Sequence, residues 1–234
     1  MYRSHDQLIL FDADGTTIDA FTAIGTAFAR NGMDIGDLVR FQKRRKLLKY
    51  LGGLREVPTN LKKQFGKHSR KRLLNSLTEV YREEAALYPG IAELLRELIA
   101  SPGIRVGMVT RNITHEPETT LRLLFRRHDI DLDDLDFFAC ISLREDKTDQ
   151  FRKARRHFDI NPARAYACGD EYRDFQAAQA SGLHPFIVSY GFEGHERLTR
   201  DFKIPVELVS STPDELCMRI RHTFVLPPHG KIAT

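Results

Sequence analysis

Two carboxylates follow the first apolar segment of the chain, in the run Asp12-Ala13-Asp14-Gly15. Acidic side chains at positions i and i+2 repel each other unless a cation or a proton lies between them. Ligands of an open α/β sheet bind beyond the carboxyl ends of its strands, which is where this pair would stand if the apolar segment is a strand. The pair taken alone would also suit a solvated turn, because Asp and Gly are common in turns.

A second acidic group lies far along the chain, at Asp170, Glu171 and Asp174. Asp170 and Asp174 are four residues apart where a helix is expected to begin, so they share a face. Glu171 and Asp174 could instead complement the positive end of that helix dipole. Carboxylates beyond two strands of one sheet can converge on a hard cation such as Mg²⁺, which prefers oxygen ligands. The two acidic groups together therefore predict a Mg²⁺ site.

Residues suited to phosphate follow two further apolar segments. Thr110 follows the segment RVGMV and precedes Arg111, whereas Lys147 lies in a loop after Phe137–Ile141. A hydroxyl group, a backbone amide and a fixed cation are what a transferring phosphoryl group needs at its equatorial oxygens. Each residue alone could be an ordinary strand-end or surface residue. In combination with the carboxylates they predict a phosphate-binding site.

These side chains converge only if several strands end at one edge of a sheet. Short apolar segments alternate with helical ones, which is typical of a parallel sheet covered on both faces. We expect strands at Leu8–Phe11, Arg105–Val109, Phe137–Ile141, Ala165–Cys168, Pro185–Val188 and Val206–Val209. We expect helices at Ile91–Ala100, Glu116–Arg127, Asp149–Phe158 and Tyr172–Ser181. The predicted fold class is α/β, with a Rossmann-like, doubly wound parallel sheet as its core.

One stretch interrupts this alternation. From about residue 20 to residue 86 the sequence shows helical periodicity, broken by glycines and a proline, and no convincing strand. About 65 residues are far too many for a βα loop, which usually has ~2–6. We therefore expect an inserted α-helical cap domain at residues 19–86, over the carboxyl edge of a core formed by residues 1–18 and 87–234.

Four motifs of the chain resemble those of the haloacid dehalogenase superfamily hydrolases, in the phosphoglycolate phosphatase-like subgroup with a helical cap. They occur in order as FDADGTTID, VTRN, the loop lysine Lys147 and GDEYRDFQAAQASG, and they span nearly the whole chain. The resemblance implies that Asp12 is the nucleophile, which forms an aspartyl-phosphate, and that Asp14 is the general acid and base. It also implies that Thr110 and Lys147 bind the phosphate.

The resemblance further implies a resident metal ion. Mg²⁺ would be held by the carboxylates of Asp12 and Asp170 and by the backbone carbonyl of Asp14, with Asp174 supporting its water shell. The carbon–halogen-cleaving members lack a carboxylate at the Asp14 position, because halide leaves without protonation. Asp14 therefore favours phosphate chemistry.

Two positions depart from the family pattern. Thr17 stands where Leu often follows the DGT, and the residues after Lys147 are TDQ in place of the usual proline-containing sequence. Arg144 or Lys153 could therefore supply the phosphate-binding cation in place of Lys147.

Basic residues gather in the expected cap, where nearly all charged residues from Arg40 to Arg72 are Lys or Arg and Glu56 is the exception. A field of this sign raises the encounter rate with anions and would serve a small phosphorylated metabolite, an anionic partner or nucleic acid. The absence of interleaved aromatic residues disfavours nucleic acid, and solvated helix faces would explain the same residues. The turn Gly52-Gly53-Leu54-Arg55 could dip toward the site, which makes Arg55 a candidate specificity residue.

Composition sets the remaining limits. The chain has 234 residues, of which 41% are hydrophobic and 29% charged, as in globular proteins. Its apolar runs are shorter than the ~18 residues that span a bilayer, and its first residues do not have the pattern of a secretory signal, so we expect a cytoplasmic protein. The sequence leaves a monomer and a homodimer both open.

The expected activity is Mg²⁺-dependent hydrolysis of a small phosphate monoester. Three other functions compete with it. A phosphomutase would use the same residues and return the phosphoryl group to a sugar, whereas a 2-haloacid dehalogenase would release halide without a metal. A protein that binds anions or nucleic acid through the basic residues, with vestigial activity, is the third.

Overall fold

The computed structural model describes residues 2, 4–37 and 67–226. Its centre is a six-stranded sheet in the order β3-β2-β1-β4-β5-β6, with every adjacent pair parallel. The strands are β1 (Gln7–Phe11), β2 (Ile104–Thr110), β3 (Phe137–Cys140), β4 (Ala165–Gly169), β5 (His184–Val188) and β6 (Val209–Ser210). The strand order reverses at β1, which pairs with β2 on one side and β4 on the other. Ligands of doubly wound folds bind beyond the carboxyl ends of the strands at such a switch point.

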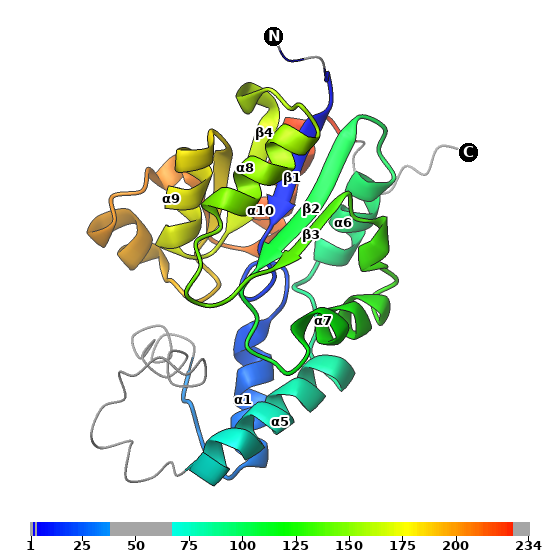
Figure 1. The fold of residues 1–234 in the computed structure, drawn as a ribbon. Helices are drawn as coiled ribbons and strands as arrows, with labels where there is room; N and C mark the ends of the chain where they lie inside the picture. Colours follow the sequence, from blue (N-terminus) through cyan, green and yellow to red (C-terminus); the bar gives the residue numbers. More distant parts are fainter. Residues whose placement is uncertain (1, 3, 38–66, 227–234) are drawn as a thin grey trace.

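Helices cover both faces of this sheet (Figure 1). The described helices are α1 (Ala20–Arg30), α5 (Lys67–Glu83), α6 (Ile91–Ile99), α7 (Pro117–Arg126), α8 (Thr148–His157), α9 (Tyr172–Ser181) and α10 (Pro213–Phe224). Helices α8 and α9 supply the core of one face, and α6 and α10 supply the core of the other. The layered α/β fold expected from the sequence is confirmed.

Strand β1 is apolar on both sides because each side meets a different helical layer. Ile9 and Phe11 belong to the core that contains α6 and α10 residues, whereas Leu8 and Leu10 belong to the core that contains α8 and α9 residues. All four side chains are fully buried. Backbone pairing with β2 and β4 along this buried strand therefore places Asp12 directly after the end of β1.

Helices α1 and α5 pack against each other beyond the carboxyl ends of the strands (Figure 1). Both lie within residues 19–86, where the sequence predicted helices and no strand. The division into core and cap stays a prediction, because residues 38–66 lie outside the described part of the chain. Arg55 and most of the basic residues belong to that range.

The last strand differs from the expectation. Residues Val206–Leu208 form a turn of 3-10 helix, and β6 is only Val209–Ser210. Pro205 precedes this turn and cannot donate a backbone hydrogen bond, which favours a turn over a ladder. Helix α10 was not anticipated. It begins at Pro213 behind Thr212, whose hydroxyl caps it.

Arg127 joins α5 to the core. Its guanidinium donates to the carbonyl oxygens of Tyr81 at 3.2 Å, of Glu83 at 3.0 Å and of Ala85. The last carbonyls of a helix have no partner within the helix, so a side chain from elsewhere can satisfy them. Arg127 follows α7 directly, and α7 packs against α5. One side chain therefore caps the end of α5 and holds it on the core.

We expect Arg127→Met to lower the free energy of unfolding by about 1–2 kcal/mol, because the three carbonyls lose a charged donor. Arg126→Met is the matched control, since within the described residues the Arg126 guanidinium pairs with Asp131 at the surface and with no backbone carbonyl. Surface ion pairs contribute about 0–1 kcal/mol. Urea denaturation of both variants measures the difference, and equal losses would contradict a capping role for Arg127.

Candidate active site

The loop after β1 folds back on itself directly behind Asp12. The carbonyl of Ala13 accepts hydrogen bonds from the N–H groups of Thr17 and Ile18, both at 2.9 Å. Gly15 closes the turn with a φ of +80°, which few residues other than glycine adopt. The Asp12 N–H donates to the Cys168 carbonyl at 2.9 Å, so the backbone of Asp12 is still held by β4. The turn therefore brings Asp12 to the end of the central strand with its backbone fixed.

Lys147 lies between two of the predicted carboxylates. Its Nζ is 2.8 Å from Asp12 Oδ1 and 2.8 Å from Asp174 Oδ1, and its side chain is 1% exposed. Arg144 and Lys153, the alternative cations, are exposed on the surface. The structure thus brings Lys147 to the carboxylates and leaves the two alternatives in solvent.

Asp170 and Asp174 are fixed at the start of α9. The N–H of Glu171 donates to Asp174 Oδ2 at 3.0 Å, and the Glu171 side chain accepts from the backbone of Asp174 in return, which makes a capping box. Asp170 Oδ2 accepts from the N–H of Phe192 at 2.6 Å. The helix-capping role considered for Glu171 and Asp174 is therefore real. For Asp174 it exists alongside the contact with Lys147.

Three carboxylates of this group are close enough to share a cation. Asp12, Asp170 and Asp174 each offer an oxygen, and these oxygens lie within 4.8 Å of one another. Within the described part of the chain, Asp170 Oδ1 and the Thr110 hydroxyl are buried and have no hydrogen-bond partner. Buried polar atoms are rarely left unpaired unless a ligand or ion completes them. An all-oxygen set of this kind fits a hard divalent cation.

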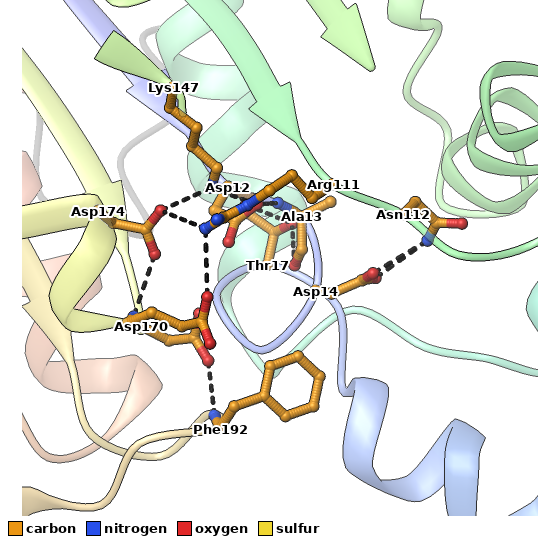
Figure 2. A network of polar contacts seen from close by, with 11 residues as sticks. Asp12, Ala13, Asp14, Thr17, Arg111, Asn112, Lys147, Asp170, Asp174 and Phe192 are labelled. Carbon is orange, nitrogen blue, oxygen red and sulfur yellow. Dashed lines mark hydrogen bonds and ion pairs between the residues drawn. The ribbon is translucent and has the colours of Figure 1, made fainter. Parts of the chain in front are cut away.

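Arg111 enters the same cluster. Its Nη2 is 3.1 Å from Glu171 Oε2 and 3.4 Å from Asp174 Oδ1, and its side chain is 8% exposed. Figure 2 shows the guanidinium in contact with Asp174. The site therefore contains two buried cations among its carboxylates.

Asp14 turns away from this cluster toward Asn112 (Figure 2). Asn112 Nδ2 donates to Asp14 Oδ2 at 3.0 Å, and the Tyr81 hydroxyl donates to Oδ1 at 2.9 Å. Thr114 donates to Asn112 Oδ1 through its N–H, at 2.9 Å, and through its hydroxyl, so the amide group of Asn112 has its nitrogen toward Asp14. Tyr81 and Asn112 were not anticipated. Asn112 stands within the VTRN motif, whereas no local signal marks Tyr81.

The two carboxylates after β1 hold protons more tightly than usual. Burial raises the pKa of Asp12, and Lys147 opposes the shift. Burial also raises the pKa of Asp14 to about 7, with a further contribution from the Asp12 carboxylate, whereas the hydrogen bonds from Tyr81 and Asn112 lower it. A carboxyl group with a pKa near neutrality can both donate and accept a proton under ordinary conditions.

The two carboxylates of α9 differ from each other. Burial raises the pKa of Asp170 well above its usual value, and Glu171 adds to the shift. Burial acts in the same direction on Asp174, but Lys147 and Arg111 outweigh it and lower the pKa of Asp174. Asp170 is thus the carboxylate for which the cluster lacks a positive partner.

Comparison with known proteins gives the family of this chain. A family model of haloacid dehalogenase-like hydrolases matches residues 7–182, and the chain belongs to this family. Protein CbbY of Cereibacter sphaeroides is 29% identical over 202 residues, which cover 80% of this chain and 85% of that protein. A phosphoglycolate phosphatase of Nitrosospira multiformis is 28% identical over 214 residues, which cover 80% of this chain and 86% of that protein.

Solved structures share the fold. The crystal structure of CbbY from Rhodobacter sphaeroides in complex with phosphate has a TM-score of 0.56 and 25% identity, and the match covers 82% of this chain and 89% of that chain. The family and the fold expected from the sequence are confirmed, and so is the expectation of an enzyme, a haloacid dehalogenase-like hydrolase. Among the helices that the structure describes, none is both long and apolar enough to cross a membrane.

We expect Asp170→Asn to stabilise the metal-free protein at neutral pH by about 1–3 kcal/mol, because it removes a carboxyl group whose ionisation is disfavoured by burial. The folded pKa of Asp170 lies above the ordinary value of 3.8, so the folded state binds more protons and the wild type loses stability as pH rises from that value. The gain should therefore shrink at acidic pH, as measured by urea denaturation at both pH values.

Asp149→Asn is the control for this prediction, since the Asp149 side chain is 91% exposed. Added Mg²⁺ should stabilise the wild type and the control by mass action, and should stabilise Asp170→Asn much less. A variant that is less stable than the wild type at neutral pH would contradict the prediction that the Asp170 carboxyl group destabilises the metal-free protein.

We expect Tyr81→Phe to raise the pKa of Asp14 above about 7, because the hydroxyl hydrogen bond favours the carboxylate form. One lost hydrogen bond corresponds to a shift of about half to one unit. NMR titration of ¹³C-labelled aspartate in the metal-free protein measures it. Tyr88→Phe is the control, since the Tyr88 hydroxyl donates to the Tyr190 carbonyl instead. Equal titration curves for Asp14 in Tyr81→Phe and the wild type would contradict the prediction.

Proposed function

We propose that this chain hydrolyses a small phosphate monoester in a Mg²⁺-dependent reaction that passes through an aspartyl-phosphate on Asp12. The observation that carries the proposal is the 2.8 Å contact between Asp12 and the buried ammonium of Lys147, at the end of the central strand. A carboxylate held in this way keeps a defined orientation, and the ammonium offsets charge when a phosphoryl group approaches.

Binding of the phosphoryl group would use one donor without a partner and two cations of the site. The Thr110 hydroxyl is buried at the end of β2 and has no partner within the described residues. It would donate to one phosphoryl oxygen, while Lys147 and Arg111 would face others. Mg²⁺ would be held by the carboxylates of Asp12 and Asp170 and by the Asp14 carbonyl, with Asp174 orienting its waters, and would supply positive charge to the site.

Two proton transfers at Asp14 complete the proposed reaction. The Asp12 carboxylate attacks phosphorus, and the leaving ester oxygen takes the proton of the Asp14 carboxyl group. Asp14 then removes a proton from water, whose oxygen attacks the aspartyl-phosphate and releases inorganic phosphate and free Asp12. A pKa of about 7 allows Asp14 to act in both directions.

The proposed substrate class is a small phosphorylated metabolite. The relatives include a phosphoglycolate phosphatase, and CbbY has been solved with phosphate and, as a variant, with xylulose-(1,5)bisphosphate. We propose that residues 19–86 form a cap that closes over the site, excludes bulk water and selects the substrate, with Arg55 as one of its specificity residues. The basic residues of this range would attract the anionic substrate.

We expect Asp12→Asn to lower the turnover of p-nitrophenyl phosphate at least about a thousand-fold, because an amide is a poor nucleophile toward phosphorus. The measurement is p-nitrophenol release with Mg²⁺ present, on variants whose thermal unfolding shows an intact fold. Asp149→Asn, on the exposed side of α8, should turn over the substrate as the wild type does.

Normal turnover by Asp12→Asn would exclude the aspartyl-phosphate route. Removal of Mg²⁺ with a chelator should abolish the wild-type reaction, and added Mg²⁺ should restore it. Chelator-insensitive release of halide from a 2-haloacid would instead identify a dehalogenase. A screen of phosphorylated metabolites with the wild type would then identify the substrate.

A further inference from the structure

The guanidinium of Arg111 contacts the carboxylates that flank the proposed metal site. Its Nη2 lies 3.1 Å from Glu171 Oε2 and 3.4 Å from Asp174 Oδ1. Asp174 is also one of the three carboxylates that could share a cation. Arg111 directly follows Thr110, whose buried hydroxyl is unpaired within the described residues. One side chain thus stands between the metal and the phosphate parts of the site.

Asp174 Oδ1 already faces two cations. Lys147 Nζ is 2.8 Å from it and Arg111 Nη2 is 3.4 Å from it. A divalent cation that enters the cluster is repelled by both, because like charges at this distance oppose each other and burial limits screening. Arginine cannot relieve this repulsion by losing its proton. Arg111 therefore opposes metal binding for as long as it stays on these carboxylates.

A phosphoryl group changes this balance. Guanidinium binds phosphate oxygens through parallel N–H donors, and such charge-assisted contacts are stronger than neutral hydrogen bonds. A rotation of the long Arg111 side chain toward a phosphoryl group at Thr110 and Asp12 would release Asp174 and Glu171. The released carboxylates could then accept hydrogen bonds from the water shell of a metal ion.

We infer that Arg111 couples the two ligands of the site: it weakens divalent-cation binding when phosphate is absent and strengthens phosphate binding. The inference rests on the proposed phosphatase function and extends it to one residue. Coupling of this kind is reciprocal, so phosphate must raise the affinity for the cation by the same factor by which the cation raises the affinity for phosphate. The site would then hold its metal firmly only when a phosphorylated molecule is present.

The test is isothermal titration calorimetry of Mg²⁺ alone, and of inorganic phosphate at saturating Mg²⁺. In Arg111→Gln we expect Mg²⁺ to bind about threefold to tenfold more tightly and phosphate to bind about tenfold more weakly than in the wild type. The opposite signs are diagnostic, since a variant that merely disturbs the fold would weaken both ligands. Thermal unfolding checks that the variants are folded.

Arg111→Lys provides a second arm. It keeps the positive charge and loses the planar fork, so we expect Mg²⁺ affinity close to that of the wild type and weaker phosphate binding. Arg221→Gln is the matched control, because Arg221 is 15% exposed and its guanidinium pairs with Glu97 on α6, which is not a residue of the site. Both affinities should stay unchanged in that control.

The outcomes separate this inference from the proposed function. If the wild type binds both ligands but Arg111→Gln weakens both, or changes neither, the coupling role of Arg111 is overturned while the phosphatase remains. If the wild type binds neither Mg²⁺ nor inorganic phosphate and does not hydrolyse phosphate esters, the proposed function itself fails.

Discussion

The buried contact between Lys147 and two carboxylates is the interaction on which the rest of the site depends. An ammonium that is 1% exposed needs opposite charges at close range, and it finds them at 2.8 Å in Asp12 and Asp174. Asp12 follows β1, Lys147 precedes α8 and Asp174 lies in α9, so one cation ties three elements together at the edge of the sheet. This cation offsets part of the negative charge of the acidic residues that gather at this edge of the sheet.

Lys147 and Arg111 do not neutralise all the carboxylates of the site, and the remaining imbalance of charge indicates which ligands the site could bind. Lys147 and Arg111 lower the pKa of Asp174, but Asp170 keeps a raised pKa and a buried oxygen without a partner in the described residues. A fold selected for stability alone would have a neutral side chain at this position. The remaining negative charge favours a cation, and the unpaired hydroxyl of Thr110 favours an anion. The unpaired groups that destabilise the metal-free protein can therefore gain partners when a cation and an anion bind.

The sequence was sufficient to predict the site residues whose position depends on where a strand ends. Asp12, Thr110 and Asp170 each stand at or directly after the end of a strand, and parallel pairing brings those ends together whatever the rest of the chain does. Tyr81 could not be found in this way, because it reaches Asp14 from a helix 67 residues later through tertiary packing alone. The short β6 was misjudged because Pro205 and the following turn, not apolar pattern, decide where that strand begins.

Gly15 and Gly191 show how far the demands of Asp170 extend into the sequence. A Cβ at either position would collide with the Asp170 carboxylate, although the two glycines belong to loops that follow different strands. Neither glycine carries a side chain that could take part in the reaction. The active site thus requires two positions without a side chain. More positions around it are therefore intolerant of substitution than carry a reactive or ligand-binding side chain. If every position of the chain were substituted in turn, the two glycines that surround Asp170 should tolerate substitution as poorly as Asp170 itself.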